Sequence, residues 1–156
     1  RKITRAVAEI AMKKKQTLFL GNLAAKRDWG HARDYVDAMW RILQQDIPED
    51  FVIATGKTNT VRDFVIKSFR HCGIELRFEG EAENEKAYVQ SCSNPNYQLP
   101  VGQNVVAVDQ RYYRPTEVDL LLGDASKARE KLKWEPSCSL DQLITEMMTA
   151  DIKNFE

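Results

Sequence analysis

Apolar residues recur along this chain at helical and at strand-like spacing in turn. Residues 1–12 repeat them every three or four positions, which predicts a helix. The run TLFLG at 17–21 is short, apolar and closed by glycine, which is typical of a buried strand. A helical stripe then runs until Pro48 and consists of Tyr35, Val36, Met39, Trp40 and Leu43. We expect this stripe to lie in the core.

The middle of the chain predicts a strand, a helix and another strand. The run FVIAT at 51–55 is continuously β-branched and aromatic, as in parallel strands that are covered on both faces. Thr60 with Asp63 resembles a capping box, and Gly73 stands where a helix would end. A strand is expected at 75–80.

The second half begins with a polar stretch at 79–104, which predicts a long and mobile loop or insertion. A strand is expected at 105–109 and a helix over 123–134, which Asp124 or Ser126 could cap. Ser139 and Gln142 resemble a further capping box before a last helix. Helices and strands alternate, so the sequence predicts an α/β fold.

Charge and cysteine content narrow the possible partners and compartment. The 156 residues carry 23 basic and 23 acidic side chains, so no overall field favours nucleic acid or an anionic membrane. The lysines at 13–15 are interpreted as a solvated helix end. Three separated cysteines without a C-x-x-C pair indicate neither a disulfide framework nor a zinc site, and fit a reducing cytosol. No apolar run is long enough for a membrane span.

Motifs for cofactor binding are absent from the sequence. It contains no G-x-G-x-x-G, no P-loop and no tyrosine followed four residues later by lysine. Because Arg1 already stands inside a helical pattern, we expect this chain to be cut from a longer one.

Two arginine-containing clusters are the candidates for chemistry. Arg27 stands beside aspartate, tryptophan and histidine, and Arg111 and Arg114 flank a pair of tyrosines. A guanidinium offers a planar fork of donors that matches phosphate oxygens. Two such arginines on separate loops could hold a diphosphate between them.

Plainer interpretations of these residues stay open. Arg27 and Asp28 could form a surface ion pair worth under about 1 kcal/mol. His31 could be a capping or packing residue rather than a base. Glu117 could be a carboxylate at a helix N-terminus.

Four blocks of the sequence resemble a known family. RDWGHARDYVDAMW, PEDFVIATG, VRDFV and RYYRPTEVDLLLGDASKAREKLKW are similar to the C-terminal part of the GDP-mannose 4,6-dehydratases, nucleotide-sugar enzymes among the extended short-chain dehydrogenases/reductases. The resemblance implies an α/β substrate-binding lobe over residues 1–156, with 51–55 extending the Rossmann sheet of an intact enzyme. It also implies an NADP-binding N-terminal half that is absent here, and a homo-oligomer.

The resemblance further implies an activity and a set of binding residues. Family members oxidise the mannose 4-hydroxyl of GDP-mannose, eliminate water and return the hydride to the terminal carbon, which gives GDP-4-keto-6-deoxymannose on the route to GDP-fucose. Their catalytic residues all precede Arg1, so none is expected in this chain. By similarity Arg27 and Arg114 would bind the diphosphate, Glu117 the ribose and Lys2 the guanine, although Lys2 as a terminal residue could also be frayed.

One segment and two rival functions remain open. Residues 87–104 depart from the family pattern and look longer, with a role that the sequence does not give. One rival is a non-catalytic interaction module that pairs with relatives. The other is a related dehydratase or epimerase acting on a different nucleotide-sugar.

Overall fold

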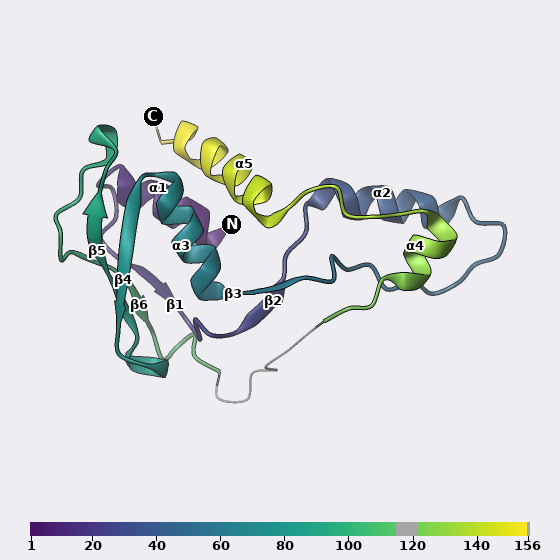
Figure 1. The fold of residues 1–156 in the computed structure, drawn as a ribbon, viewed down its shortest axis with the longest axis horizontal. Helices are drawn as coiled ribbons and strands as arrows, with labels where there is room; N and C mark the ends of the chain where they lie inside the picture. The colour runs from purple at the N-terminus through teal and green to yellow at the C-terminus, as the bar shows by residue number, and fades with distance from the viewer. Residues whose placement is uncertain (115–121, 156) are drawn as a thin grey trace. The chain divides into compact units, whose positions relative to one another are not determined.

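The computed structural model describes residues 1–114 and 122–155, and its α/β architecture confirms the predicted fold class. The chain divides into two compact units, each assembled from separate stretches (Figure 1). Unit 1 contains Arg1–Ala25, Thr60–Glu117 and Ile144–Glu156, and unit 2 contains Lys26–Asn59 and Val118–Leu143. Within the described residues, no helix has the length and apolar character to cross a membrane.

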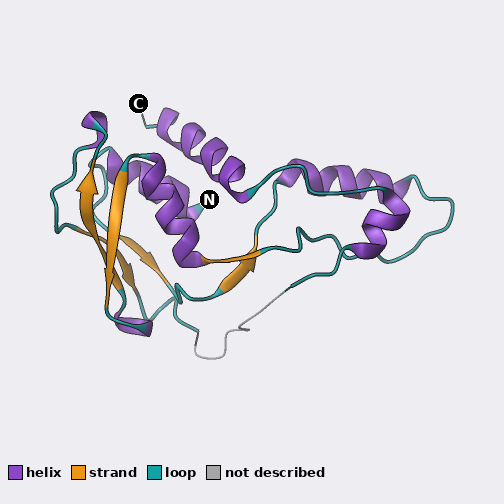
Figure 2. Ribbon diagram, viewed as in Figure 1, coloured by secondary structure: helices purple, strands orange, loops and turns teal. Residues whose placement is uncertain are grey.

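Unit 1 is built on a mixed four-stranded sheet in the order β1-β6-β5-β4 (Figure 2). Its strands are β1 (Leu18–Leu20), β4 (Ile74–Glu79), β5 (Lys86–Cys92) and β6 (Asn104–Val108). β1 runs parallel to β6 with Leu18 opposite Val106, whereas the two other pairs are antiparallel. The predicted strands at 17–21, 75–80 and 105–109 are thus confirmed within one residue or two.

Three helices complete unit 1: α1 (Lys2–Ala11), α3 (Val61–His71) and the C-terminal part of α5 (Leu140–Lys153). α1 and α3 contact each other and the sheet, and Val7, Ile10 and Phe69 are fully buried. The predicted capping box at the start of α3 is present, with Asp63 N–H donating to the Thr60 hydroxyl at 3.0 Å. The C-terminus of α5 returns to α1, where the Lys14 ammonium donates to the Phe155 carbonyl.

A buried ion pair joins α3 to the sheet. The Arg62 guanidinium donates through Nε (2.7 Å) and Nη2 (2.9 Å) to the carboxylate of Glu85, whose side chain is 4% exposed. Val108 N–H donates to the Glu85 carbonyl, so the same residue also contacts the end of β6. The fork matches both carboxylate oxygens, which compensates for the removal of this charge from water.

The prediction of a long mobile loop over 79–104 was wrong. The segment contains β5, which is hydrogen-bonded to strands on both sides, and the short 3₁₀ turns η1 (Ala82–Asn84) and η2 (Pro95–Tyr97). Ala87 and Val89 alternate toward the core and are fully buried, while the residues between them are polar or partly exposed. Composition alone therefore concealed a strand with one buried face.

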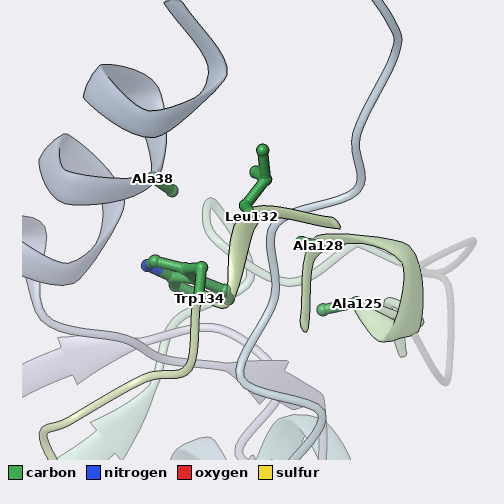
Figure 3. Packing of buried hydrophobic residues seen from close by; sticks show 5 residues of the cluster. All are labelled: Ala38, Ala125, Ala128, Leu132 and Trp134. Atoms are coloured by element: carbon green, nitrogen blue, oxygen red, sulfur yellow. The ribbon is translucent and has the colours of Figure 1, made fainter. Parts of the chain in front are cut away.

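Unit 2 packs around a small cluster of buried side chains. Its elements are β2 (Lys26–Asp28), which pairs with β3 (Thr58–Thr60), together with α2 (Ala32–Leu43) and α4 (Ser126–Leu132). The cluster gathers one residue of α2 with residues of α4 and its flanks (Figure 3): Ala38, Ala125, Ala128, Leu132 and Trp134. The Trp134 indole N–H donates to the Asp34 carbonyl at 2.8 Å, which satisfies its polar atom inside the core.

Two sequence-based expectations differ from the structure of unit 2. The apolar stripe of α2 was expected in the core, but Val36, Met39, Trp40 and Leu43 are 60–80% exposed, and the buried side of the helix is narrow. Residues 51–55 have no strand assignment, although Phe51 and Ile53 pack against the cluster. An extended segment is assigned as a strand only when it forms hydrogen bonds with another strand. The place of residues 51–55 in the sheet of an intact enzyme therefore stays a prediction.

Candidate functional site

Strand β2 and its neighbouring turn hold the first candidate arginine. Arg27 is half-buried, and its Nη1 donates to the Lys26 carbonyl at 2.7 Å. The adjacent Asp28 carboxylate accepts from the Thr55 hydroxyl (2.5 Å), the Thr55 N–H (3.3 Å) and the Gly56 N–H (3.0 Å). Asp28 therefore ties the arginine-bearing strand to the turn at 55–57, where Gly56 has a φ of +75°.

The loop after β2 turns directly into α2. His31 is the N-cap of this helix, and its Nδ1 accepts from the Arg33 N–H at 3.0 Å, which supports the capping interpretation of this residue. Gly30 packs so closely on the Tyr35 ring and on Thr55 that a Cβ at this position would clash with both. Contacts of Asp28, Gly30 and His31 thus hold the part of the RDWGH loop that directly follows Arg27.

A buried carboxylate fastens the start of α2 to the end of unit 2. Asp34 is 6% exposed, and it accepts from the Ser137 hydroxyl (2.6 Å), the Ser137 N–H (3.0 Å) and the Cys138 N–H (3.2 Å). Burial raises the pKa of Asp34, but these hydrogen bonds and the nearby His31 outweigh burial, so the pKa lies below its ordinary value. Asp34 is ionised at neutral pH and stabilises this junction.

Unit 1 carries the second cluster beyond the end of β6. Asp109 accepts from the Arg111 N–H and from its guanidinium, with Nη2 at 2.7 Å, and this pairing lowers the pKa of Asp109. The Lys2 ammonium lies 3.6 Å from the centroid of the Tyr112 ring. Gly21 lies against the Tyr112 backbone without room for a Cβ. The first turn of α1 and the loop at 109–114 therefore meet.

The structure places the four predicted binding residues as follows. The Lys2 ammonium contacts the Tyr112 ring in the loop that leads to Arg114, and Arg114 is exposed two residues beyond Tyr112. Arg27 belongs to unit 2, whereas Lys2 and Arg114 belong to unit 1. The convergence of Arg27 and Arg114 on one diphosphate, and of Lys2 on the guanine, stays a prediction. Glu117 lies outside the described residues.

Sequence reasoning missed the two carboxylates that hold the arginine loop. Asp28 was considered only as an ion-pair partner, and Asp34 was not singled out. From the sequence, Asp34 is only an aspartate in the first turn of a helix, where it stabilises the helix dipole. Its hydrogen bonds to Ser137 and Cys138 cannot be recognised from neighbouring residues, because these partners lie about 100 positions further along the chain. No cluster of three histidine, cysteine, aspartate or glutamate residues suited to a metal occurs in the described parts of the chain.

Unit 2 also contains an open pocket of about 250 Å³ beside this loop. Its lining combines residues of the 29–59 stretch with residues near 136–142: Trp29, Thr55, Lys57, Asn59, Pro136, Ser137, Cys138, Ser139, Leu140 and Gln142. The indole of Trp29 thus faces a recess rather than a closed core.

Comparison with known proteins shows which family this chain resembles. The family model described as GDP-mannose 4,6 dehydratase matches residues 1–147. The GDP-mannose 4,6 dehydratases of Dictyostelium discoideum and Homo sapiens are each 52% identical over 153 residues. The matches cover 98% of this chain but only 40% and 39% of those proteins. A Vibrio cholerae GDP-mannose 4,6-dehydratase is 50% identical, with 100% and 42% covered.

Solved structures support the fold at much lower identity. The Pseudomonas aeruginosa protein RMD, complexed with NADPH, superposes with a TM-score of 0.68 at 14% identity, covering 99% of this chain and 43% of that one. A UDP-glucose 4-epimerase from Thermotoga maritima gives 0.65 at 20% identity, covering 97% and 39%. The chain thus spans about 40% of the length of its relatives. It belongs to the GDP-mannose 4,6-dehydratase family and corresponds to a C-terminal portion of these enzymes.

Proposed function

We propose that this chain supplies GDP-sugar recognition to a GDP-mannose 4,6-dehydratase that forms GDP-4-keto-6-deoxymannose. The observation that carries the proposal is the 52% identity to such dehydratases over 98% of the chain. The anchoring of Asp28 to Thr55 and Gly56 supports it, because it fixes the backbone beside Arg27 and so reduces the conformational entropy that this loop loses on binding.

Each predicted residue has a chemically suited partner in GDP. Arg27 and Arg114 would donate to the diphosphate oxygens, which carry the charge that a guanidinium fork matches. Glu117 would accept from the ribose hydroxyls, and Lys2 would donate to the guanine carbonyl. The contact of the Lys2 ammonium with the Tyr112 ring supports this role, because it brings Lys2 to the loop that carries Arg114.

The redox chemistry is assigned to another part of the enzyme. NADP would supply the hydride acceptor and donor, but this chain lacks the glycine-rich turn that a pyrophosphate of that cofactor requires. None of its residues is assigned to proton transfer. Its contribution is to bind the nucleotide and thereby position the hexose. The homo-oligomer and the cytosolic setting inferred from the sequence stay predictions.

Calorimetric titration of the chain with GDP at low salt tests this assignment. Arg27→Ala and Arg114→Ala should each weaken GDP binding about 10- to 100-fold, because a charge-assisted hydrogen bond contributes about 1.5–3 kcal/mol. Arg33→Ala, an exposed arginine of α2, is the matched control and should leave GDP affinity unchanged. Equal affinities in all three variants would refute the diphosphate role.

The same titration separates the rival functions. A sister dehydratase or epimerase would prefer UDP or dTDP over GDP. Structural neighbours act on such nucleotides, namely the Thermotoga UDP-glucose 4-epimerase and a dTDP-glucose 4,6-dehydratase from Bacillus anthracis. A non-catalytic module would bind none of the three. The isolated chain should also fail to dehydrate GDP-mannose when NADP is added. Turnover by the isolated chain would contradict the assignment of the redox chemistry to another part of the enzyme.

A further inference from the structure

The pocket beside the RDWGH loop belongs wholly to unit 2. Its walls come from Trp29 of that loop, from residues 55–59 and from residues 136–142. Lys2, Arg27 and Arg114 are not among its described lining residues. Its volume of about 250 Å³ lies just below the range of about 300–1,000 Å³ that is typical of sites for drug-sized ligands. The space therefore suits a ligand of one ring better than a nucleotide-sugar.

Two carboxylates hold the walls of this pocket in place. Thr55 lines the pocket, and its hydroxyl donates to Asp28 at 2.5 Å. Ser137 also lines it, and its hydroxyl donates to Asp34 at 2.6 Å. Asp34 is 6% exposed and accepts from the Cys138 N–H as well. Because these bonds fix the walls within the unit itself, little conformational entropy is lost when a ligand binds between them.

The polar atoms of the lining keep hydrogen-bonding capacity of both kinds. The side-chain carbonyl of Gln142 accepts from the Ser139 N–H, which leaves its NH2 group as a donor. The Ser137 hydroxyl donates to Asp34 and keeps its lone pairs as acceptors. The Asn59 side-chain amide, which is both a donor and an acceptor, has no hydrogen bond to another residue in the described part of the chain.

Apolar groups of the lining complement these polar atoms. Trp29, Pro136 and Leu140 belong to the wall, and Trp29 supplies the aromatic ring. An indole ring offers a flat apolar face at little cost in conformational entropy, which suits a ligand that has one apolar face of its own. The pocket thus combines one aromatic surface with donors and acceptors beside it.

Charge in and around the pocket favours a neutral ligand. Lys57 is the single charged residue of the described lining. Asp28 and Asp34 lie directly behind Thr55 and Ser137, at hydrogen-bond distance from them. An anion would therefore be attracted by one exposed ammonium and repelled by two carboxylates, and a cation would meet the ammonium first. A neutral ligand with many hydroxyl groups avoids both conflicts.

We propose that this pocket binds a single pyranose sugar ring, with one face of the ring on Trp29 and hydroxyl groups on Asn59 and Gln142. A pyranose presents C–H groups on its faces and hydroxyl groups around its edge, and each hydroxyl is both a donor and an acceptor. This arrangement matches the lining in size, polarity and charge. The site is separate from the GDP-binding residues of the proposed function and does not depend on them.

Nuclear magnetic resonance of the indole N–H groups tests the site without GDP. The chain contains three tryptophans, and a Trp29→Phe variant identifies the signal of Trp29. D-Mannose should shift this signal saturably with a Kd of about 1–10 mM, as expected for a ligand of about a dozen non-hydrogen atoms. The signals of Trp40, which is 60% exposed on α2, and of Trp134, which is buried, should stay in place. Glycerol at the same concentration is the control for unspecific binding by a polyol.

Variants locate the bound sugar within the pocket. Asn59→Ala removes a hydrogen-bonding group and should raise the Kd for mannose about two- to tenfold. Trp29→Ala should abolish saturation transfer from the protein to the sugar protons. Trp40→Ala is the matched control, because this tryptophan lies outside the pocket, and it should leave the Kd unchanged. An unshifted Trp134 signal shows that each variant is folded.

Several results would overturn the inference. One is a Trp29 signal that mannose leaves in place, and another is an equal response of this signal to glycerol. Inorganic phosphate that shifts the Trp29 signal where mannose does not would show an anion site on Lys57 instead. Unchanged mannose affinity in the folded Asn59→Ala variant, together with unchanged saturation transfer in Trp29→Ala, would place the sugar elsewhere.

A bound sugar should also steady the loop that carries Arg27, since Asp28 joins that loop to the pocket wall at Thr55. This consequence rests on the proposed function and is measured separately. GDP should bind at least about twofold more tightly when mannose saturates the pocket. Equal GDP affinities with and without mannose would refute the coupling. A chain that binds mannose but no GDP would refute the proposed function and the coupling together, and would support the sugar site.

Discussion

Replacement of Asp34 by alanine tests whether one buried carboxylate holds the arginine loop in place. The variant removes the acceptor of three hydrogen bonds, two from the N–H groups of Ser137 and Cys138 and one from the Ser137 hydroxyl. Bonds to a charged group contribute about 1.5–3 kcal/mol each, but water reaches the exposed Ser137, and the three are not additive. We expect a loss of about 3 kcal/mol, which is a large part of the usual stability of about 5–15 kcal/mol.

Urea denaturation followed by tryptophan fluorescence measures this loss, because Trp134 is buried and bonded to the same residue. Asp37→Ala is the matched control, since its carboxylate is 43% exposed and pairs with Arg41 on the helix surface. That variant should lose under about 1 kcal/mol. A loss for Asp34→Ala no greater than that of the control would refute the reasoning.

The pH dependence of the same variant gives an independent check. Because the pKa of Asp34 in the folded chain lies below its ordinary value of 3.8, its contribution is complete above that value and is lost as pH falls through the folded pKa. The stability difference between the native chain and Asp34→Ala should therefore be constant near neutral pH and shrink in strong acid. A difference that grows on acidification would contradict the assigned direction.

Three further predictions concern unit 1. Thr60→Ala removes the capping box with Asp63 and should cost about 1 kcal/mol in urea denaturation, whereas an unchanged midpoint would speak against the cap. Gly21→Ala forces a Cβ against the Tyr112 backbone, so it should lower the melting temperature and weaken GDP binding. An unchanged melting temperature and GDP affinity would show that the loop at 109–114 moves to make room for the Cβ. Burial and the neighbouring Cys92 raise the pKa of the Cys72 thiol to about 12. Iodoacetamide at pH 8 should therefore modify Cys72 only after denaturation. Mass spectrometry that finds Cys72 alkylated in the folded chain would contradict this expectation.

Local sequence signals predicted much of the fold. The capping boxes at Thr60 and Ser139 marked the starts of α3 and α5, because the residues that satisfy a helix end lie within three positions of one another. The periodicity of α2 gave its position correctly but not its buried side. Apolar spacing identifies a face that needs a partner, and it does not say whether that partner lies within the same chain.

The candidate site was only partly predictable. Arg27 and Arg114 were singled out because guanidinium groups in aromatic loops have a recognisable composition, and their binding roles stay predictions. The contacts around the first of them were not found, since Asp28 reaches Thr55 and Asp34 reaches Ser137 through tertiary folding alone. Strand β5 was missed for a related reason: its polar residues mark an outer face, and only its pairing with β4 and β6 shows the inner one.

The parallel pairing of β1 with β6 has a consequence for how this protein is made. A nascent chain releases β1 from the ribosome well before β6, because the strand that receives it is complete only at Val108. The last turns of α5, which return Asp151 and Phe155 to α1, come later still. Until β6 and α5 have been synthesised, apolar side chains of α1 and β1 are without their neighbours in the folded unit, so this stretch is exposed to aggregation during that interval. A premature stop before Ile144 would leave unit 1 without its third segment.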